Sequence, residues 1–262
     1  MQITAKSPFE TWFCSPEEPA SGRDRRADVF CFPCAGAGAA SFFGLCRALP
    51  RFVVPYVLRL PGRESARHMP AMTDIASMAS AAANALRPRL GERPAVFWGH
   101  SMGALVAFEV AQLLRSEGAP ALLVASGHAA PRLRRRREPV PIQQLSDDAF
   151  IDLLERYNGT PRAVLADRDL LSVFMPQLRS DFTALDAYAY VERGPLECDV
   201  FCLNGQGDQL VSKEGAQAWR EQTRGKFRCE WLPGEHFFLN QDLRATVRVV
   251  GEAIATSLEI AV

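Results

Sequence analysis

The sequence lacks an excess of charge of either sign and any long apolar run. Lys and Arg together number 30, and Asp and Glu together number 30, so the formal net charge at pH 7 is zero. Proteins that hold nucleic acid or an anionic membrane usually carry a basic surplus, so we expect neither partner. No apolar run approaches the roughly 20 residues that cross a bilayer, and the first residues do not resemble a secretory leader. We expect a soluble, cytoplasmic protein.

Cysteine is not arranged for disulfides or for metal binding. The seven cysteines are odd in number, and most stand inside apolar runs, which is typical of reduced, buried thiols. Cys31 and Cys34 form a C-x-x-C pair, but no second pair and no histidine cluster stands at metal-ligand spacing. We therefore expect no redox centre, no metal and no bound cofactor.

What the sequence does contain is a regular alternation of strand-like and helix-like segments, from about residue 28 to the end. Short apolar runs predict buried strands, and the amphipathic or Ala-rich stretches between them predict helices. Such an alternation implies a mostly parallel sheet with helices on both faces. Because no internal repeat and no low-complexity linker interrupts it, we expect residues 1–262 to form a single α/β domain.

One long stretch, from about residue 131 to residue 191, breaks the alternation. It contains no convincing strand and is filled by helical patterns such as residues 147–157 and 167–191. An insertion between two strands of a doubly wound sheet lies above the carboxyl ends of the strands, where such sheets bind ligands. We therefore expect a helical lid.

A G-x-S-x-G motif, GHSMG at residues 99–103, stands between a predicted strand and a predicted helix. The pentamer alone arises by chance in about one chain in ten of this length. Its flanks make it informative, because a sharp strand-to-helix turn raises the serine above the sheet and leaves no room for side chains at Gly99 and Gly103. Ser101 is the candidate nucleophile. The alternative is a serine that only caps a glycine-bounded helix.

A histidine stands where a serine hydrolase needs its general base. In the G-x-S-x-G hydrolases the serine, the acid and the histidine follow one another along the chain, each after a strand. Of the four histidines, His236 alone follows the last strand-like segment. We expect a structural role for His100 beside the nucleophile, a solvated position for His68 and a packing role for His128.

The acid is predicted from its place after the preceding strand. Asp208 stands a few residues beyond that strand in a Gly-rich loop, whereas Asp199 stands at its beginning. Glu235 is a rival because it neighbours His236, although adjacent loop residues seldom hydrogen-bond through facing side chains. Asp208 is therefore the candidate that orients His236 and stabilises its charged form.

Two backbone N–H groups are candidates for an oxyanion hole, the pair of donors that hold the negative oxygen of a tetrahedral intermediate. That of Met102 follows the nucleophile at a helix N-terminus. That of Ala35 lies in the small-residue loop after the first core strand. The competing interpretation of this loop, phosphate binding, lacks both a Walker Lys-Ser/Thr and a G-x-G-x-x-G with a following ribose acid.

Several segments, in order over nearly the whole chain, resemble those of one family, the stand-alone type II thioesterases of nonribosomal peptide and polyketide synthesis. They are FPCAGAGAASFFG, LPGRESARHMP, GHSMGALVAFEVA, ASGHAAP, LLSVFMPQLRSDF, NGQGDQLVS and LPGEHFFL. The resemblance implies the α/β-hydrolase fold with a helical lid. It also implies hydrolysis of acyl or peptidyl thioesters on the phosphopantetheine arm of a carrier protein, in which Ser101, His236 and Asp208 act as the triad. Cys34 and the AGAG that follows depart from the family's usual loop.

Alternatives remain at this stage. A lipase or carboxylesterase would use the same triad, a product-releasing thioesterase domain would share the fold, and a non-catalytic scaffold would be expected to have lost a triad member. No Pro-rich or Ser-rich linker precedes residue 28, which favours an independent protein over an excised domain. The basic run RLRRRR, residues 132–137, suggests a dock for an acidic carrier protein, although charge runs are more often solvated surface.

Overall fold

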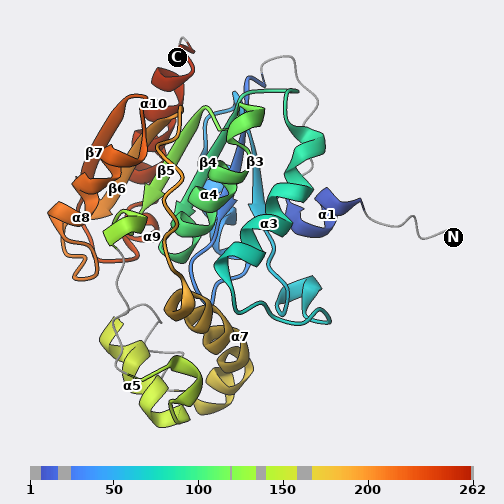
Figure 1. Cartoon of the computed structure of the whole chain (residues 1–262), viewed down its shortest axis with the longest axis vertical. Coiled ribbons are helices and arrows are strands. Elements are labelled where there is room, and N and C mark those ends of the chain that lie inside the picture. Colours follow the sequence, from blue (N-terminus) through green and yellow to red (C-terminus); the bar gives the residue numbers. More distant parts are fainter. Residues whose placement is uncertain (1–6, 17–24, 119, 134–139, 158–166, 261–262) are drawn as a thin grey trace, which may run out of the picture.

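The computed structural model describes residues 7–16, 25–118, 120–133, 140–157 and 167–260 (Figure 1). One seven-stranded sheet runs through it in the order β1-β3-β2-β4-β5-β6-β7. All neighbouring pairs are parallel except β1 and β3. The strands are β1 (Phe13–Cys14), β2 (Ala27–Phe32), β3 (Val53–Leu58), β4 (Ala95–His100), β5 (Leu122–Ser126), β6 (Asp199–Gly205) and β7 (Phe227–Leu232). The expected mostly parallel sheet is confirmed.

Helices cover both faces of this sheet. The described α-helices are α1 (Pro8–Trp12), α2 (Phe43–Ala48), α3 (Ile75–Leu86), α4 (Met102–Leu113), α5 (Asp147–Tyr157), α7 (Arg168–Ala187), α8 (Lys213–Gln217), α9 (Phe238–Gln241) and α10 (Leu243–Ser257). Helices α3 and α4 pack on one face, and α2 and α10 pack on the other. A mostly parallel sheet with helices on both faces is the arrangement of the α/β-hydrolase fold that the sequence resemblance implied.

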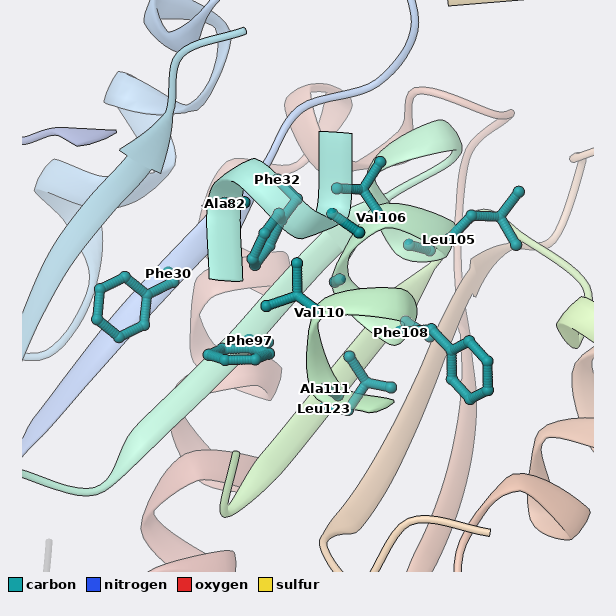
Figure 2. Packing of buried hydrophobic residues seen from close by; sticks show 14 of the residues in the cluster. Phe30, Phe32, Ala82, Phe97, Leu105, Val106, Phe108, Val110, Ala111 and Leu123 are labelled. Carbon is teal, nitrogen blue, oxygen red and sulfur yellow. The ribbon is translucent and has the colours of Figure 1, made fainter. Parts of the chain in front are cut away.

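Each inner strand contributes side chains to two separate apolar clusters, because its successive side chains point to opposite faces of the sheet. In β2, Phe30 and Phe32 join the cluster under α3 and α4, whereas Val29 and Cys31 join the cluster under α10. Figure 2 shows Phe97 of β4 beside Val110 of α4, with Phe30 further to the left on β2. This double burial explains why the strands read as continuous apolar runs and not as alternating ones.

The N-terminal residues contribute elements that the sequence pattern did not indicate. Helix α1 begins with a capping box between Ser7 and Glu10, and β1 adds an antiparallel edge to β3. Phe9 and Phe13 of this segment stack with ring centroids 5.4 Å apart and contact Phe30 of the inner strand β2. A two-residue strand is too short to show a periodic pattern, so only the packing reveals it.

Helices α5 and α7 lie in the stretch of residues 131–191, which we call the helical insertion. Figure 1 shows them at one end of the sheet, away from the C-terminus. In the described part of this stretch no strand forms, in agreement with the sequence. Its side chains build a third apolar cluster of their own around Phe150, Leu154 and Leu178. None of the described helices is long and apolar enough to cross a membrane.

Candidate active site

The turn at Ser101 is built by close backbone packing. Ser101 has φ +53° and ψ −118°, a strained conformation for a residue with a side chain, and its N–H donates to Ser126 O on β5 at 2.8 Å. A Cβ atom at Gly99 would lie 2.2 Å from Gly103 O, and one at Gly103 would lie 1.9 Å from Phe32 O. Both glycines are therefore required for α4 to begin this close to β4 and β2.

Three side chains predicted from the sequence come together above the carboxyl ends of the strands. His236 Nε2 lies 3.0 Å from Ser101 Oγ, and His236 Nδ1 lies 2.8 Å from Asp208 Oδ2. The imidazole and the carboxylate are buried, with side-chain exposures of 7% and 0%, whereas Ser101 is partly exposed. Ser101 is thus partly open to solvent, and its two partners are shielded from water.

The loops that carry the acid and the histidine are fastened to each other. Gly207 N–H donates to Gly234 O at 2.8 Å, and a Cβ at Gly205 would lie 2.3 Å from Glu235 O. Asp208 Oδ1 accepts the N–H of Leu210 at 2.8 Å, which leaves Oδ2 directed at the imidazole. The Gly-rich composition of the acid loop therefore serves to let the histidine loop approach it.

His100 is buried directly behind His236, as its expected structural role requires. Its ring centroid lies 5.1 Å from that of His236, and its Nδ1 lies 3.2 Å from Ser126 Oγ. Burial holds the pKa of His100 well below its usual value, and the neighbouring imidazole of His236 lowers it further. His100 is therefore neutral near pH 7 and adds no positive charge behind His236, the candidate base.

The two remaining histidines lie apart from this chain of hydrogen bonds. His68 is exposed, as expected. His128 is half-buried, and its carbonyl accepts the indole N–H of Trp219 at 2.8 Å, in line with the expected packing role.

The loop after β2 passes close to the start of α4. Phe32 O and Pro33 O lie against Gly103, next to the N–H of Met102, which is the first residue of the helix and has no intrahelical acceptor. Within the described part of this loop, the N–H groups of Gly36 and Ala37 donate to protein oxygens, and that of Ala35 does not.

The cysteines of the C-x-x-C pair face different surroundings. Cys31 is fully buried, with its sulfur 3.9 Å from that of Cys46. Burial, reinforced by the carboxylate of Asp181, raises the pKa of Cys34 to about 12, so this thiol stays protonated at neutral pH. In the described ranges, no group of three or more His, Cys, Asp or Glu residues is placed to hold a metal ion.

Comparison with known proteins assigns the chain to a family. The family described as Thioesterase domain matches residues 27–254, which include all three of these side chains. The chain belongs to the thioesterase family. It is accordingly a serine-type thioester hydrolase, as the sequence resemblance implied.

Several similar proteins are named for biosynthetic pathways. Gramicidin S biosynthesis protein GrsT of Aneurinibacillus migulanus is 34% identical over 239 residues, which cover 90% of this chain and 91% of that one. The type II thioesterase BorB from the borrelidin biosynthetic cluster superposes with a TM-score of 0.83 at 29% identity, covering 97% and 99% of the two chains. The RedJ thioesterase of Streptomyces coelicolor gives 0.81 at 31% identity, covering 96% and 91%. The resemblance to type II thioesterases is thereby confirmed.

Sequence reasoning missed a set of polar residues around the loop after β2, three of them buried and one, Glu64, exposed. They are Arg63, Glu64, Gln177 and Asp181, which hydrogen-bond to its backbone. They stand inside the segments LPGRE and LLSVFMPQLRSDF, which the resemblance had singled out. The available signal was a charged residue, Arg63, within a family motif. Its partner Asp181 could not be found from the sequence, because it lies more than a hundred positions away.

Proposed function

We propose that this thioesterase releases acyl or peptidyl groups from the phosphopantetheine arm of a carrier protein, with Ser101 as nucleophile, His236 as general base and Asp208 as the acid that orients it. The observation that carries the proposal is the continuous chain of hydrogen bonds from Ser101 Oγ through His236 to Asp208, with distances of 3.0 and 2.8 Å.

In the first half-reaction Ser101 Oγ attacks the thioester carbonyl while His236 Nε2 takes the hydroxyl proton. The negative oxygen of the tetrahedral intermediate is held by the N–H groups of Met102 and Ala35. The C–S bond then breaks, the imidazolium gives its proton to the departing thiolate, which leaves as a thiol, and the acyl group remains on Ser101. Asp208 holds the imidazole in the tautomer that accepts at Nε2.

In the second half-reaction water replaces the thiol. His236 removes a proton from the water, whose oxygen attacks the acyl-enzyme carbonyl, and the same two N–H groups hold the second oxyanion. The ester bond to Ser101 breaks, His236 returns the proton to the serine, and a free carboxylic acid leaves. These steps use no metal and no organic cofactor.

The names of two similar proteins support a carrier-bound substrate. GrsT is named for gramicidin S biosynthesis, and BorB for a borrelidin biosynthetic cluster. A role in removing wrong or stalled groups from such synthases follows from the resemblance to type II thioesterases. Most of the basic run proposed as a carrier dock, residues 134–137, lies outside the described residues.

The test is Ser101→Ala assayed on a carrier protein loaded with a panel of acyl groups. We expect loss of release by at least about 10³-fold, because removing a nucleophile leaves only the oxyanion hole and binding. Mass spectrometry of the unmodified enzyme should detect an acyl adduct on Ser101 that the variant lacks.

A matched control is Ser77→Ala, which removes an exposed hydroxyl at the start of α3 and should leave turnover unchanged. Release by Ser101→Ala at a rate comparable to the unmodified enzyme would refute the nucleophile. Faster hydrolysis of matched oxygen esters than of acyl-pantetheine thioesters would favour a carboxylesterase instead.

A further inference from the structure

Asp181 is a fully buried carboxylate on α7, far from the nucleophile in sequence. Its Oδ2 accepts the backbone N–H of Gly36 at 2.7 Å and Arg63 Nη1 at 2.9 Å, and its Oδ1 accepts Arg63 Nη2 at 2.7 Å. The side chains of Asp181 and Arg63 are 0% and 2% exposed. The ion pair therefore joins the helical insertion to the loop that carries Ala35.

Arg63 and its neighbour hold the same loop from a second direction. Arg63 Nη1 also donates to Ala37 O at 2.9 Å. The carboxylate of Glu64 accepts the N–H groups of Ala39 and Ala40 at 3.1 and 3.0 Å. Glu64 has φ +48°, which is strained for a residue with a side chain. The strained backbone is consistent with a segment that is held in place by its hydrogen bonds to the loop after β2.

Helix α7 also contacts the loop directly. Gln177 Nε2 donates to Gly36 O. Gly36 has φ +74°, and a Cβ atom there would lie 2.3 Å from Leu178 Cδ2. Both polar groups of the Gly36 backbone are thus bonded to α7, one residue after the proposed oxyanion donor.

The chemistry of this arrangement points to positioning and not to stability. A buried ion pair contributes little net stability, because the desolvation of both charges offsets their attraction. A carboxylate this close to an oxyanion hole would also repel the developing negative oxygen unless a cation compensates it, and Arg63 supplies that cation. The N–H of Gly36, being bonded to Asp181, is unavailable to a substrate.

We propose that Asp181 and Arg63 are positioning residues: together with Gln177 they hold the loop after β2 so that the Ala35 N–H faces the oxyanion, and they make this geometry depend on the seating of helix α7. The inference rests on the proposed function, because it assigns a role relative to the Ser101 reaction. Displacement of α7 would then weaken the oxyanion hole without moving the triad.

The test is the double variant Arg63→Met/Asp181→Leu, in which apolar residues of similar volume replace the pair so that no unpaired charge remains buried. On an acyl thioester of N-acetylcysteamine, we expect kcat to fall about 10- to 100-fold with KM within about twofold. The estimate lies below the 10²- to 10³-fold cost of deleting an oxyanion donor, because the donor is displaced and not removed.

The matched control is Asp28→Leu/Arg93→Met. This pair has its Nε–Oδ1 contact at 2.8 Å and a buried carboxylate, but it lies at the amino end of β2, away from the site. Its kcat should equal that of the unmodified enzyme. A kcat of Arg63→Met/Asp181→Leu within twofold of this control, or a rise in KM with unchanged kcat, would overturn the inference.

Gln177→Leu provides a second route if the double variant fails to fold. It removes one hydrogen bond to the loop and keeps the ion pair, so we expect a three- to tenfold loss of kcat; no loss would contradict the proposal. Ser101→Ala is assayed on the same substrate. Turnover by Ser101→Ala at a rate comparable to the unmodified enzyme would refute the proposed function itself. The expected large loss in Ser101→Ala beside a normal kcat in Gln177→Leu would refute only this inference.

Discussion

At the scale of single residues, the site depends as much on missing side chains as on reactive ones. Gly99 and Gly103 have no room for a Cβ, and Gly205 lies against the histidine loop. These contacts allow Ser101 to adopt its strained backbone and allow His236 to reach Asp208. The G-x-S-x-G spacing could be recognised in the sequence because the tight strand-to-helix turn excludes a side chain at each glycine position.

Asp208→Asn tests the acid at this scale. If the amide turns its NH₂ group toward His236 Nδ1, it stabilises the wrong tautomer. If it turns its oxygen, it accepts the Nδ1 proton but carries no charge to stabilise the imidazolium. In both cases kcat should fall, by about 10⁴-fold. Steady-state hydrolysis of an acyl-carrier substrate measures the loss. A mild effect would move the role toward Glu235, and Asp199→Asn at the opposite end of β6 serves as the control that should retain activity.

At the scale of elements, the helical insertion is a small structure with its own core. Phe150 is completely buried in it, its ring meets that of Phe182 edge-on at 5.5 Å, and the guanidinium of Arg179 lies 4.7 Å from its centroid. This cluster is separate from the two cores on the faces of the sheet. We therefore expect the part of the insertion that holds this cluster to lose order without loss of the sheet.

Phe150→Ala should expose that independence. Truncating a buried phenylalanine costs about 3–5 kcal/mol, and we expect the cost to appear as faster hydrogen exchange in α5 and α7, with β4 and β5 unchanged. Val173→Ala, at a position 71% exposed on α7, should leave exchange unaltered. Equal acceleration in the sheet strands would mean that insertion and sheet open together.

At the scale of the whole molecule, the balanced charge leaves little global repulsion near neutral pH. Acid destabilisation should therefore begin at individual buried groups. His100 is the clearest of them, because burial holds its pKa well below the usual value of 6.5. Below pH 6.5 the unfolded chain binds a proton at His100 that the native state does not bind, so stability present above that pH is lost as pH falls.

His100→Gln should remove this contribution. Between pH 6.5 and 5.5 the free energy of unfolding of the unmodified protein should fall more steeply than that of the variant, by up to about 1.4 kcal/mol per pH unit. Urea unfolding at several pH values measures the difference. The exposed His68→Gln should follow the unmodified protein, and parallel curves for His100→Gln would contradict the buried neutral assignment.

The amino-acid sequence by itself determined the alternating elements, the candidate nucleophile and the candidate partners, because these follow from hydrophobic periodicity and from the fixed chain order of serine, acid and histidine. Only the tertiary structure decided the antiparallel β1 edge and the joining of Asp181 on α7 to Arg63 and Gly36. Such contacts link positions that share no local pattern, so they exist only once distant segments have packed together. The candidate triad could be predicted from motif spacing. The groups that hold it could not, because they are brought together only by three-dimensional proximity.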